Sequence, residues 1–250
     1  MKTLLDAIAD KRDRLDRLRP LSPEALGKLE HYYDVEITYT SNAIEGNTLS
    51  PVETTLVIEQ GVTIGGKPLK DHLEALDHYD AIRYVRELGR ERTPLTESDV
   101  RNLHRLVVQR SRPDIAGRYA DLARYVRTDS GRHEFPSPAE IPALMGDFAK
   151  WLGGVPETPQ AAFTAHRRLV EIHPFNDGNG RTARLLMNLV LIRGGHPPIA
   201  VRPSDRPAYI RALQQSQAGG RDESFYELLY ERLDATLGEY LSAFEGARPA

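Results

Sequence analysis

The segment His173–Arg184 constrains the local fold of this chain more than any other stretch, because Pro174 restricts its backbone and two glycines allow a sharp turn. Pro174 disfavours the right-handed helical region for the residue before it, so His173 should lie on a loop. Gly178 and Gly180 permit a sharp turn and a close approach of a ligand to the backbone. The segment therefore predicts a loop that carries a histidine and then turns sharply.

A helix should follow this turn. The pattern from Arg181 onward is helical, and paired glycines at 194–195 followed by paired prolines at 197–198 end it. Unpaired N–H groups and the helix dipole at such a start favour an anion. Arg181 and Arg184 are three residues apart on one helix face, so we expect both guanidinium groups to reach the same phosphate tail.

Two further side chains complete the inventory of a phosphate-transfer site. Asp177 would repel a phosphate beside it unless a cation lay between them, and Mg²⁺ bridging carboxylate and phosphates resolves that conflict. The imidazole of His173, with an ordinary pKa of about 6.5, suits removal of a proton from an incoming hydroxyl. The segment thus predicts a base, a metal ligand, an anion-binding turn and fixed positive charge close together.

Other interpretations of the segment stay open. Gly178-Asn-Gly180-Arg-Thr-Ala183 formally matches the dinucleotide-binding fingerprint, but the repeated strand–helix alternation of that fold is not visible. A Walker A loop is excluded because no G-x-x-x-x-G-K-(S/T) pattern occurs. An ordinary loop whose histidine is simply hydrogen-bonded explains His173 alone. It explains less well why His, Asp, Gly-Asn-Gly and two Arg occur together.

The composition favours a soluble protein of the cytoplasm. The 250 residues suffice for one large domain or two modest ones, and the absence of cysteine excludes disulfides and thiolate chemistry. A net charge of −3 with interspersed signs gives no basic footprint for nucleic acid. Asp6 and Asp10 come too early for a signal-peptide core, and no stretch approaches transmembrane length, so we expect no membrane association.

Helical signals dominate the rest of the chain, so the predicted fold class is all-α. Ser22 with Pro23 starts one helix, and Ser50–Glu53 and Ser137–Glu140 have the form of capping boxes with proline at the first helical position. Further helices are expected near residues 68–89, 96–110, 138–152, 158–171, 204–218 and 222–243. We divide the chain into an N-terminal helical region (1–95) and a core with C-terminal helices (96–250).

One segment, residues 123–135, breaks the helical rule. Aromatic and β-branched residues flank Asp129-Ser130-Gly131, a pattern typical of a short hairpin. An isolated hairpin is marginal in water, so it should lie against helices with one edge free. A free edge can bind an extended peptide by strand addition, although a plain surface hairpin is the alternative.

Ser41 and Glu45 form a second informative pair. They are four residues apart on what should be one helix face, and Gly46 suits a helix stop. A carboxylate in the last turn faces the negative end of the helix dipole, which is unfavourable unless a cation meets it. By itself the pattern is a weak signal.

The segment from His173 resembles the signature of the Fic (filamentation induced by cAMP) family, His-x-Phe-x-(Asp/Glu)-Gly-Asn-Gly-Arg-x-x-Arg. All specified positions match, namely His173, Phe175, Asp177, Gly178, Asn179, Gly180, Arg181 and Arg184. The resemblance extends over about residues 35 to 235. It implies a Fic-type helical domain with the hairpin as a flap, and transfer of AMP from Mg-ATP to a hydroxyl of a target protein.

The resemblance also implies roles for individual residues. His173 would deprotonate a target Ser, Thr or Tyr, Asp177 would hold Mg²⁺, and Phe175 would anchor the loop in the core. Arg184 would lie closest to the γ-phosphate. The remaining nucleotide contacts implied are an anion hole at Gly178, Asn179 and Gly180, a second clamp at Arg181, and adenosine contacts at Tyr209 and Gln217, for which packing or capping is the competing explanation.

Beside this signature, the segment from Ser41 matches the inhibitory motif (S/T)-x-x-x-E-(G/N) of the family, in its N-terminal (class II) position. The resemblance implies that Glu45 pairs with Arg184 and occupies the guanidinium that the γ-phosphate needs, while Ser41 holds the helix. The expected activity is an autoinhibited protein adenylyltransferase. Open alternatives are removal of AMP with Glu45 as a base, transfer of UMP, phosphocholine or phosphate, and a catalytically silent nucleotide-binding module.

The expected partners are ATP and a protein target bound along the flap, residues 123–135. The resemblance also implies self-modification. Ala120 stands where the family often has an arginine, so target contacts in this loop stay open. A homodimer that secures the inhibitory helix is compatible with the sequence, which leaves the oligomeric state open.

Overall fold

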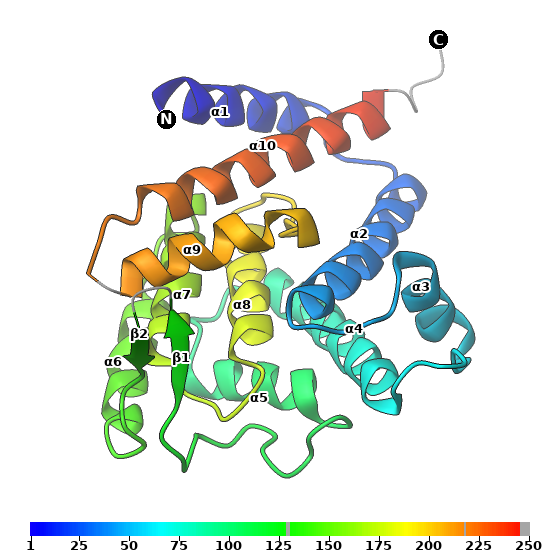
Figure 1. Cartoon of the computed structure of the whole chain (residues 1–250). Helices are drawn as coiled ribbons and strands as arrows, with labels where there is room; N and C mark the ends of the chain where they lie inside the picture. The colour runs from blue at the N-terminus through cyan, green and yellow to red at the C-terminus, as the bar shows by residue number, and fades with distance from the viewer. Residues whose placement is uncertain (129–130, 218, 246–250) are drawn as a thin grey trace.

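Helices make up most of the fold, and the predicted all-α class is confirmed (Figure 1). The computed structural model describes residues 1–128, 131–217 and 219–245. The helices are α1 (Lys2–Arg17), α2 (Pro23–Ile44), α3 (Pro51–Gln60), α4 (Leu69–Arg90), α5 (Glu97–Val108), α6 (Ile141–Gly153), α7 (Pro159–Ile172), α8 (Asn179–Arg193), the 3₁₀ turn η1 (Pro203–Asp205), α9 (Arg206–Gln217) and α10 (Glu223–Glu245).

The predicted hairpin is present as a two-stranded antiparallel sheet among the helices. β1 (Tyr125–Thr128) pairs antiparallel with β2 (Gly131–Glu134), and Tyr125 lies opposite Glu134. The pairing continues beyond the strands, since Phe135 N donates to Arg124 O at 3.1 Å. The turn predicted at Asp129-Ser130 falls outside the described residues. The side chain of Gln214 donates to Arg127 O at 3.4 Å, so the hairpin also contacts α9.

Helix α8 occupies the centre of the fold (Figure 1). Its apolar residues face every direction, and α7, α4 and α5 pack around it. A helix that is hydrophobic all round belongs in a core. The site at the start of α8 is therefore carried by the most buried element of the chain.

The first and last helices lie together, with α1 along α10 (Figure 1). Lys11 pairs with Asp234 at 2.7 Å, and apolar residues of both helices belong to one hydrophobic core with those of α8. The core thus crosses residue 95, and the division of the chain at that point stays a prediction.

The helix starts follow the capping signals with one correction. Ser22 caps α2, and Ser50 forms the complete box with Glu53. The predicted box at Ser137 is wrong, because α6 begins only at Ile141 with Glu140 as its N-cap. The Glu140 carboxylate accepts hydrogen bonds from both N and Oγ of Ser137, at 2.8 and 2.6 Å. The serine hydroxyl is therefore a donor within a turn and does not cap a helical N–H.

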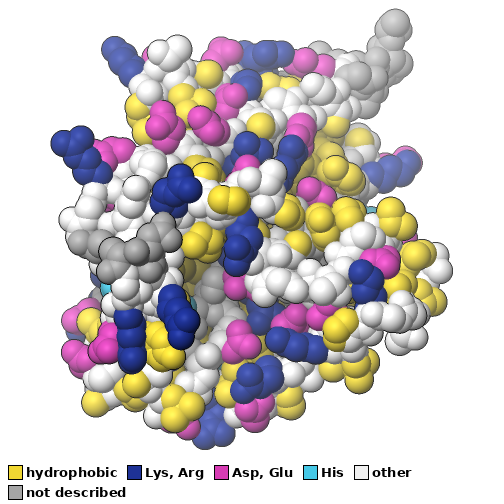
Figure 2. Space-filling view, in the orientation of Figure 1, with side chains coloured by type: hydrophobic (Ala, Val, Ile, Leu, Met, Phe, Trp, Pro, Cys, Tyr) yellow, Lys and Arg dark blue, Asp and Glu magenta, His cyan; other side chains and the backbone are white. Residues whose placement is uncertain are grey.

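Charged side chains of both signs alternate over the face shown in Figure 2, as the composition leads us to expect. Across the three described stretches of the chain, none of the helices has the length and apolar character that crossing a membrane requires.

Candidate active site

Two left-handed residues bracket the loop that joins α7 to α8. His173, directly after α7, has φ 50° and ψ 56°, and Gly178, the N-cap of α8, has φ 76°. A left-handed conformation is uncommon for a residue other than glycine and marks a strained backbone that its surroundings must hold. The loop and helix start therefore follow the prediction, with His173 in the left-handed region.

The side chain of Asn179 closes this loop. Its Oδ1 accepts from Phe175 N at 2.9 Å, and its Nδ2 donates to Phe175 O at 2.7 Å. Phe175 itself is fully buried, as expected of an anchor. The amide of Asn179 is thus used inside the loop, and its backbone N–H belongs to the first helical turn, which has no helical acceptor.

The imidazole of His173 has a defined tautomer. Nδ1 lies 3.3 Å from Val170 O, and because a carbonyl can only accept, Nδ1 carries the proton and Nε2 keeps a free lone pair. Burial is the main cause that lowers the pKa of His173 to about 4; the Val170 bond opposes this shift and the nearby Arg124 guanidinium adds to it. The ring stacks on Phe135, with centroids 3.8 Å apart. His173 is therefore a neutral base held against the end of the hairpin.

Asp177 keeps one carboxylate oxygen available. Its Oδ1 accepts from Gly178 N at 2.6 Å and from Arg181 at 3.4 Å, whereas Oδ2 has Arg112 only at 3.8 Å. No group of three potential ligands that could hold a metal occurs in the described stretches. Mg²⁺ commonly takes one or two carboxylates and fills its remaining positions with phosphates and water. The donor set therefore fits Mg²⁺ when a nucleotide accompanies it.

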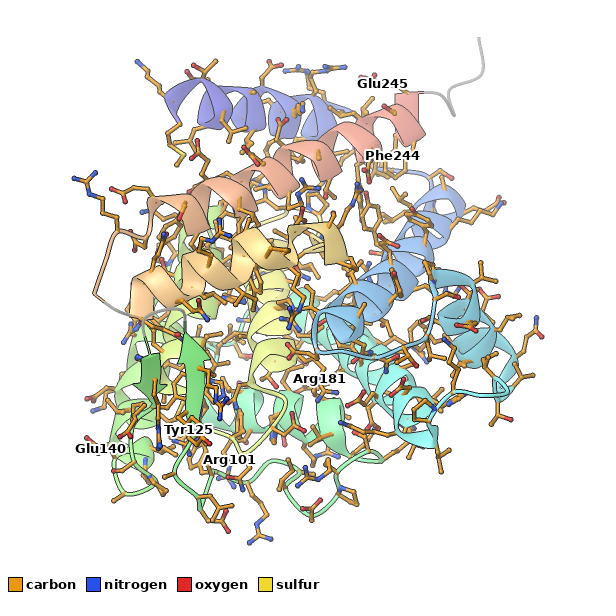
Figure 3. All side chains as sticks on the ribbon, viewed as in Figure 1. Arg101, Tyr125, Glu140, Arg181, Phe244 and Glu245 are labelled. Atoms are coloured by element: carbon orange, nitrogen blue, oxygen red, sulfur yellow. The ribbon has the colours of Figure 1, made fainter. Side chains whose placement is uncertain are left out.

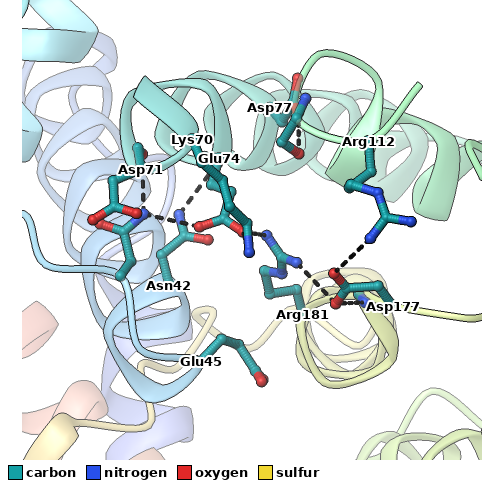
Figure 4. A network of polar contacts seen from close by, with 12 residues as sticks. Asn42, Glu45, Lys70, Asp71, Glu74, Asp77, Arg112, Asp177 and Arg181 are labelled. Atoms are coloured by element: carbon teal, nitrogen blue, oxygen red, sulfur yellow. Dashed lines mark hydrogen bonds and ion pairs between the residues drawn. The ribbon is translucent and has the colours of Figure 1, made fainter. Parts of the chain in front are cut away.

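Arg181 lies in the first turn of α8 (Figure 3). Its side chain is 2 % exposed and pairs with Glu74 of α4 at 3.1 Å as well as with Asp177 (Figure 4). Glu74 also accepts from the Asn47 side chain at 3.1 Å. This network connects the segment after α2 to Asp177, and it directs Arg181 to partners that differ from those of Arg184. Its role as a phosphate clamp stays a prediction.

Arg184 meets the two residues of the N-terminal motif. Its Nη2 lies 2.7 Å from Glu45 Oε1, its Nε donates to Ser41 Oγ at 2.9 Å, and Nη2 also donates to Ser41 O at 2.9 Å. The Arg184 side chain is 4 % exposed and that of Glu45 is 39 % exposed. Glu45 directly follows α2, so this acid at the negative helix end has the cation that the dipole argument requires.

The Glu45 carboxylate rests on the first turn of α8. A Cβ added to Gly180 would overlap Glu45 Oε1 and would come within 3.1 Å of Arg184 Nη1. Glycine at 180 is therefore needed for this close approach. The start of a helix is where an anion binds most readily, and here a carboxylate of the chain itself lies there.

Tyr209 and Gln217 are placed differently from each other. Tyr209 is buried, and its hydroxyl lies 2.7 Å from His166 Nε2 and 3.5 Å from Arg184 Nη1. Gln217 is the last residue of α9 and is half-buried. Packing accounts for Tyr209 in this structure, and adenosine contacts for both residues stay a prediction.

The sequence reasoning missed His104, Glu74 and Phe135. His104 lies on the apolar face of α5 with Val100, Leu103 and Val107, where a buried histidine is the only signal. Glu74 and Phe135 offered none, because their partners are far away in sequence.

A model of the Fic/DOC family matches residues 94–191, which include the whole loop and the start of α8. A Fic domain containing signaling protein from Bacteroides thetaiotaomicron has a similar structure, with a TM-score of 0.87 and 32 % identity, covering 97 % of this chain and 98 % of that one. The chain belongs to the Fic/DOC family. Fic-1 (residues 134–508) from Caenorhabditis elegans is similar to this Fic chain with a TM-score of 0.83 and 30 % identity, covering 97 % and 71 %.

Among curated relatives, the protein adenylyltransferase Fic of Nematostella vectensis is 34 % identical over 247 residues, which is 96 % of this chain and 56 % of the relative. The protein adenylyltransferase Fic of Aedes aegypti is 32 % identical over 243 residues, which is 95 % of this chain and 48 % of the relative. This Fic chain therefore spans about half the length of the curated relatives it matches.

Proposed function

We propose that this Fic protein is an adenylyltransferase, which transfers AMP from ATP to a hydroxyl of a protein and is held off by Glu45. The observation that carries the proposal is the 2.7 Å pair of Glu45 with Arg184, which rests on the helix start where phosphate would bind. The names of the curated relatives support the activity.

The chemistry follows from the neutral base. As the oxygen of the target hydroxyl attacks the α-phosphorus, its proton passes to Nε2 of His173. The bond from the α-phosphorus to the oxygen that bridges to the β-phosphorus breaks, and pyrophosphate leaves. A base whose Nδ1 is fixed by Val170 O presents Nε2 in one orientation, which general-base catalysis requires.

The remaining residues of the segment bind the nucleotide in this proposal. Backbone N–H groups of the first turn, at Gly178 to Gly180, face the phosphates, and Arg184 receives the γ-phosphate once Glu45 leaves it. Asp177 would hold Mg²⁺, which when bound neutralises phosphate charge. Arg181, which pairs with Asp177, would be the second clamp on the phosphates, and Tyr209 and Gln217 would contact the adenosine.

The hairpin is the proposed site for the target segment. A two-stranded sheet offers an outer edge to which an extended peptide can add. Phe135 follows β2 directly and stacks on His173, so a segment bound along residues 125–134 would hold its hydroxyl near the base. Self-modification, a homodimer and a cytoplasmic location belong to the same proposal.

The position of the radiolabel tests the reaction. The purified Glu45→Gly variant, incubated with Mg²⁺ and ATP labelled on either the α- or the γ-phosphate, should incorporate only the α label into itself. His173→Ala in the same background should abolish incorporation. Incorporation of the γ label would show phosphate transfer and would refute AMP transfer.

The reverse reaction is a second candidate, because the Glu45 carboxylate is 39 % exposed while it holds Arg184, so water can reach it. In that case Glu45 would act as a base on a water molecule that removes AMP. Incubation of an AMP-modified target with wild type and with Glu45→Gly separates the two functions. Release by wild type alone would assign removal to Glu45, and release by neither would leave AMP transfer alone.

A further inference from the structure

His104 contacts the catalytic loop at three residues although it lies outside the signature, in α5. Its ring is fully buried and stacks face to face on Phe175, with centroids 3.7 Å apart and planes 2° apart. Nε2 lies 3.0 Å from Asp177 O. A Cβ added to Gly178 would lie 3.4 Å from His104 Cδ2, so the ring also covers the turn.

The second ring nitrogen faces a different segment. The backbone N–H of Gly117 donates to Nδ1 of His104 at 3.1 Å. Since Nδ1 accepts, the proton of the neutral ring lies on Nε2, which donates to the Asp177 carbonyl. Both nitrogens are therefore satisfied by one neutral tautomer, and that tautomer joins two loops.

The two loops meet again beside this contact. Ala120 N donates to Pro174 O at 2.9 Å, and the segment with Gly117 and Ala120 leads into β1. His104 thus lies between the loop that carries Asp177 and the segment that positions the hairpin. Its side chain holds the backbone of Asp177, while Asn179 closes the loop at Phe175.

We infer that His104 is a positioning residue that aims the Asp177 carboxylate at the Mg²⁺ which accompanies the nucleotide. The inference rests on the proposed function for the identity of the bound group. The Asp177 carboxylate accepts from Gly178 N at 2.6 Å, and this N–H belongs to the same peptide unit as the carbonyl that His104 holds, so the carboxylate follows the orientation of that unit. Outer groups that orient a metal ligand commonly change metal affinity by about 10- to 100-fold when they are removed.

Two substitutions separate the contacts of the ring. His104→Phe keeps the stack on Phe175 and removes both hydrogen bonds. His104→Gln keeps an amide N–H able to reach the Asp177 carbonyl and removes the stack. His196→Phe is the matched control. His196 is also buried, but it lies just after the far end of α8 and bonds to Arg12.

Calorimetry provides the readout that does not depend on turnover. The affinity of each protein, in a Glu45→Gly background, is measured for the non-hydrolysable α,β-methylene analogue of ATP with and without Mg²⁺. His104→Phe should reduce the gain in affinity from Mg²⁺ by about tenfold, leaving metal-free binding unchanged, and His104→Gln should retain more of that gain. His196→Phe should match the parent.

A purely structural histidine would give a different result. An unchanged gain from Mg²⁺ in His104→Phe, with only a lowered melting temperature, overturns the inference. If His104→Phe does not fold, the same comparison on His104→Gln decides, with a partial reduction expected and an unchanged gain contradicting it. Since binding is measured directly, failure of AMP transfer in the labelling assay would leave this result interpretable.

Discussion

Glu45 Oε1 lies 2.7 Å from Nη2 of Arg184, a pair that joins the end of α2 to α8 across 139 positions of sequence. The guanidinium is almost fully buried and also bonds to Ser41, so it has little freedom to take another anion. Under the proposed function, the pair would place a carboxylate of the chain in direct competition with a phosphate of the nucleotide.

The first prediction concerns discrimination between ATP and ADP. In wild type the γ-phosphate finds Arg184 occupied, so ATP and ADP should bind with affinities within about threefold. In Glu45→Gly the γ-phosphate gains charge-assisted hydrogen bonds worth about 1.5–3 kcal/mol, so ATP should bind at least about tenfold more tightly than ADP. Calorimetry measures both ratios. Glu45→Gln is the control, and its ratio of ATP to ADP affinity should lie between those of wild type and Glu45→Gly. Equal ratios in all three proteins would contradict competition between Glu45 and the γ-phosphate for Arg184.

The second prediction concerns the buried ion pair beneath the loop. Glu74→Ala leaves the Arg181 guanidinium without its buried carboxylate, which should reduce the free energy of unfolding by about 3–5 kcal/mol. Lys70→Ala removes an exposed partner of the same carboxylate and should change it by less than about 1 kcal/mol. Chemical denaturation measures the free energy of unfolding of both variants. Similar losses would show that the buried pair contributes no more to stability than the exposed one.

The third prediction concerns the pH dependence of activity. Burial lowers the pKa of His173 to about 4, so the base stays neutral as the pH falls through 6.5, the ordinary histidine value. In the Glu45→Gly variant kcat/KM at pH 5.5 should therefore remain within about twofold of its value at pH 7.5. Binding of Mg-ATP at each pH is the control for protonation of the nucleotide. A tenfold fall at pH 5.5 would instead indicate an ordinary pKa of about 6.5.

The fourth prediction concerns acid stability. Burial lowers the pKa of His196 to about 4 and that of His166 to about 3. Between these values and the unfolded value of about 6.5 the unfolded state binds more protons, so stability is lost as the pH falls through this window. Burial raises the pKa of Asp34 to about 6, which opposes the trend below that pH. Two histidines oppose this one carboxylate, so we expect a net loss of stability toward acid pH.

A variant isolates one of these contributions. Wild type should lose more unfolding free energy than His196→Phe when the pH falls from 7 to 5, and the difference should be about 2 kcal/mol. In the variant, the unfolded state has no histidine at position 196 to take up a proton. Denaturant titrations of both proteins at the two pH values measure it. The same loss in wild type and variant would show that the pKa of His196 is close to its ordinary value.

Local chemistry explains why the loop from His173 to Gly178 was predictable. Pro174 restricts the backbone and Gly178 permits a left-handed turn regardless of what packs around them, so the loop, turn and helix start followed from the residues alone. The predicted start of α6 was wrong because a local bond formed in place of the expected cap. The Glu140 carboxylate accepts from both N and Oγ of Ser137, which makes a turn before the helix.

Partners that are far apart in sequence were predictable only from the family resemblance. Nothing in the spacing of Ser41 and Glu45 identifies Arg184, which the resemblance supplied and which lies at 2.7 Å. The pairing of Arg181 with Glu74 could not be predicted, because Glu74 lies far away in sequence, on α4. His104 was missed because a lone histidine on an apolar helix face gives no indication of the loop that it will hold.

The most direct test of the account is the initial rate of AMP incorporation at saturating Mg-ATP, measured with the α-label in wild type and in Glu45→Gly at equal protein concentration. Release of Arg184 should raise the rate by at least about tenfold, which corresponds to about 1.4 kcal/mol of competition. Equal rates in the two proteins, with Glu45→Gly folded and binding ATP, would contradict the claim that Glu45 holds the enzyme off.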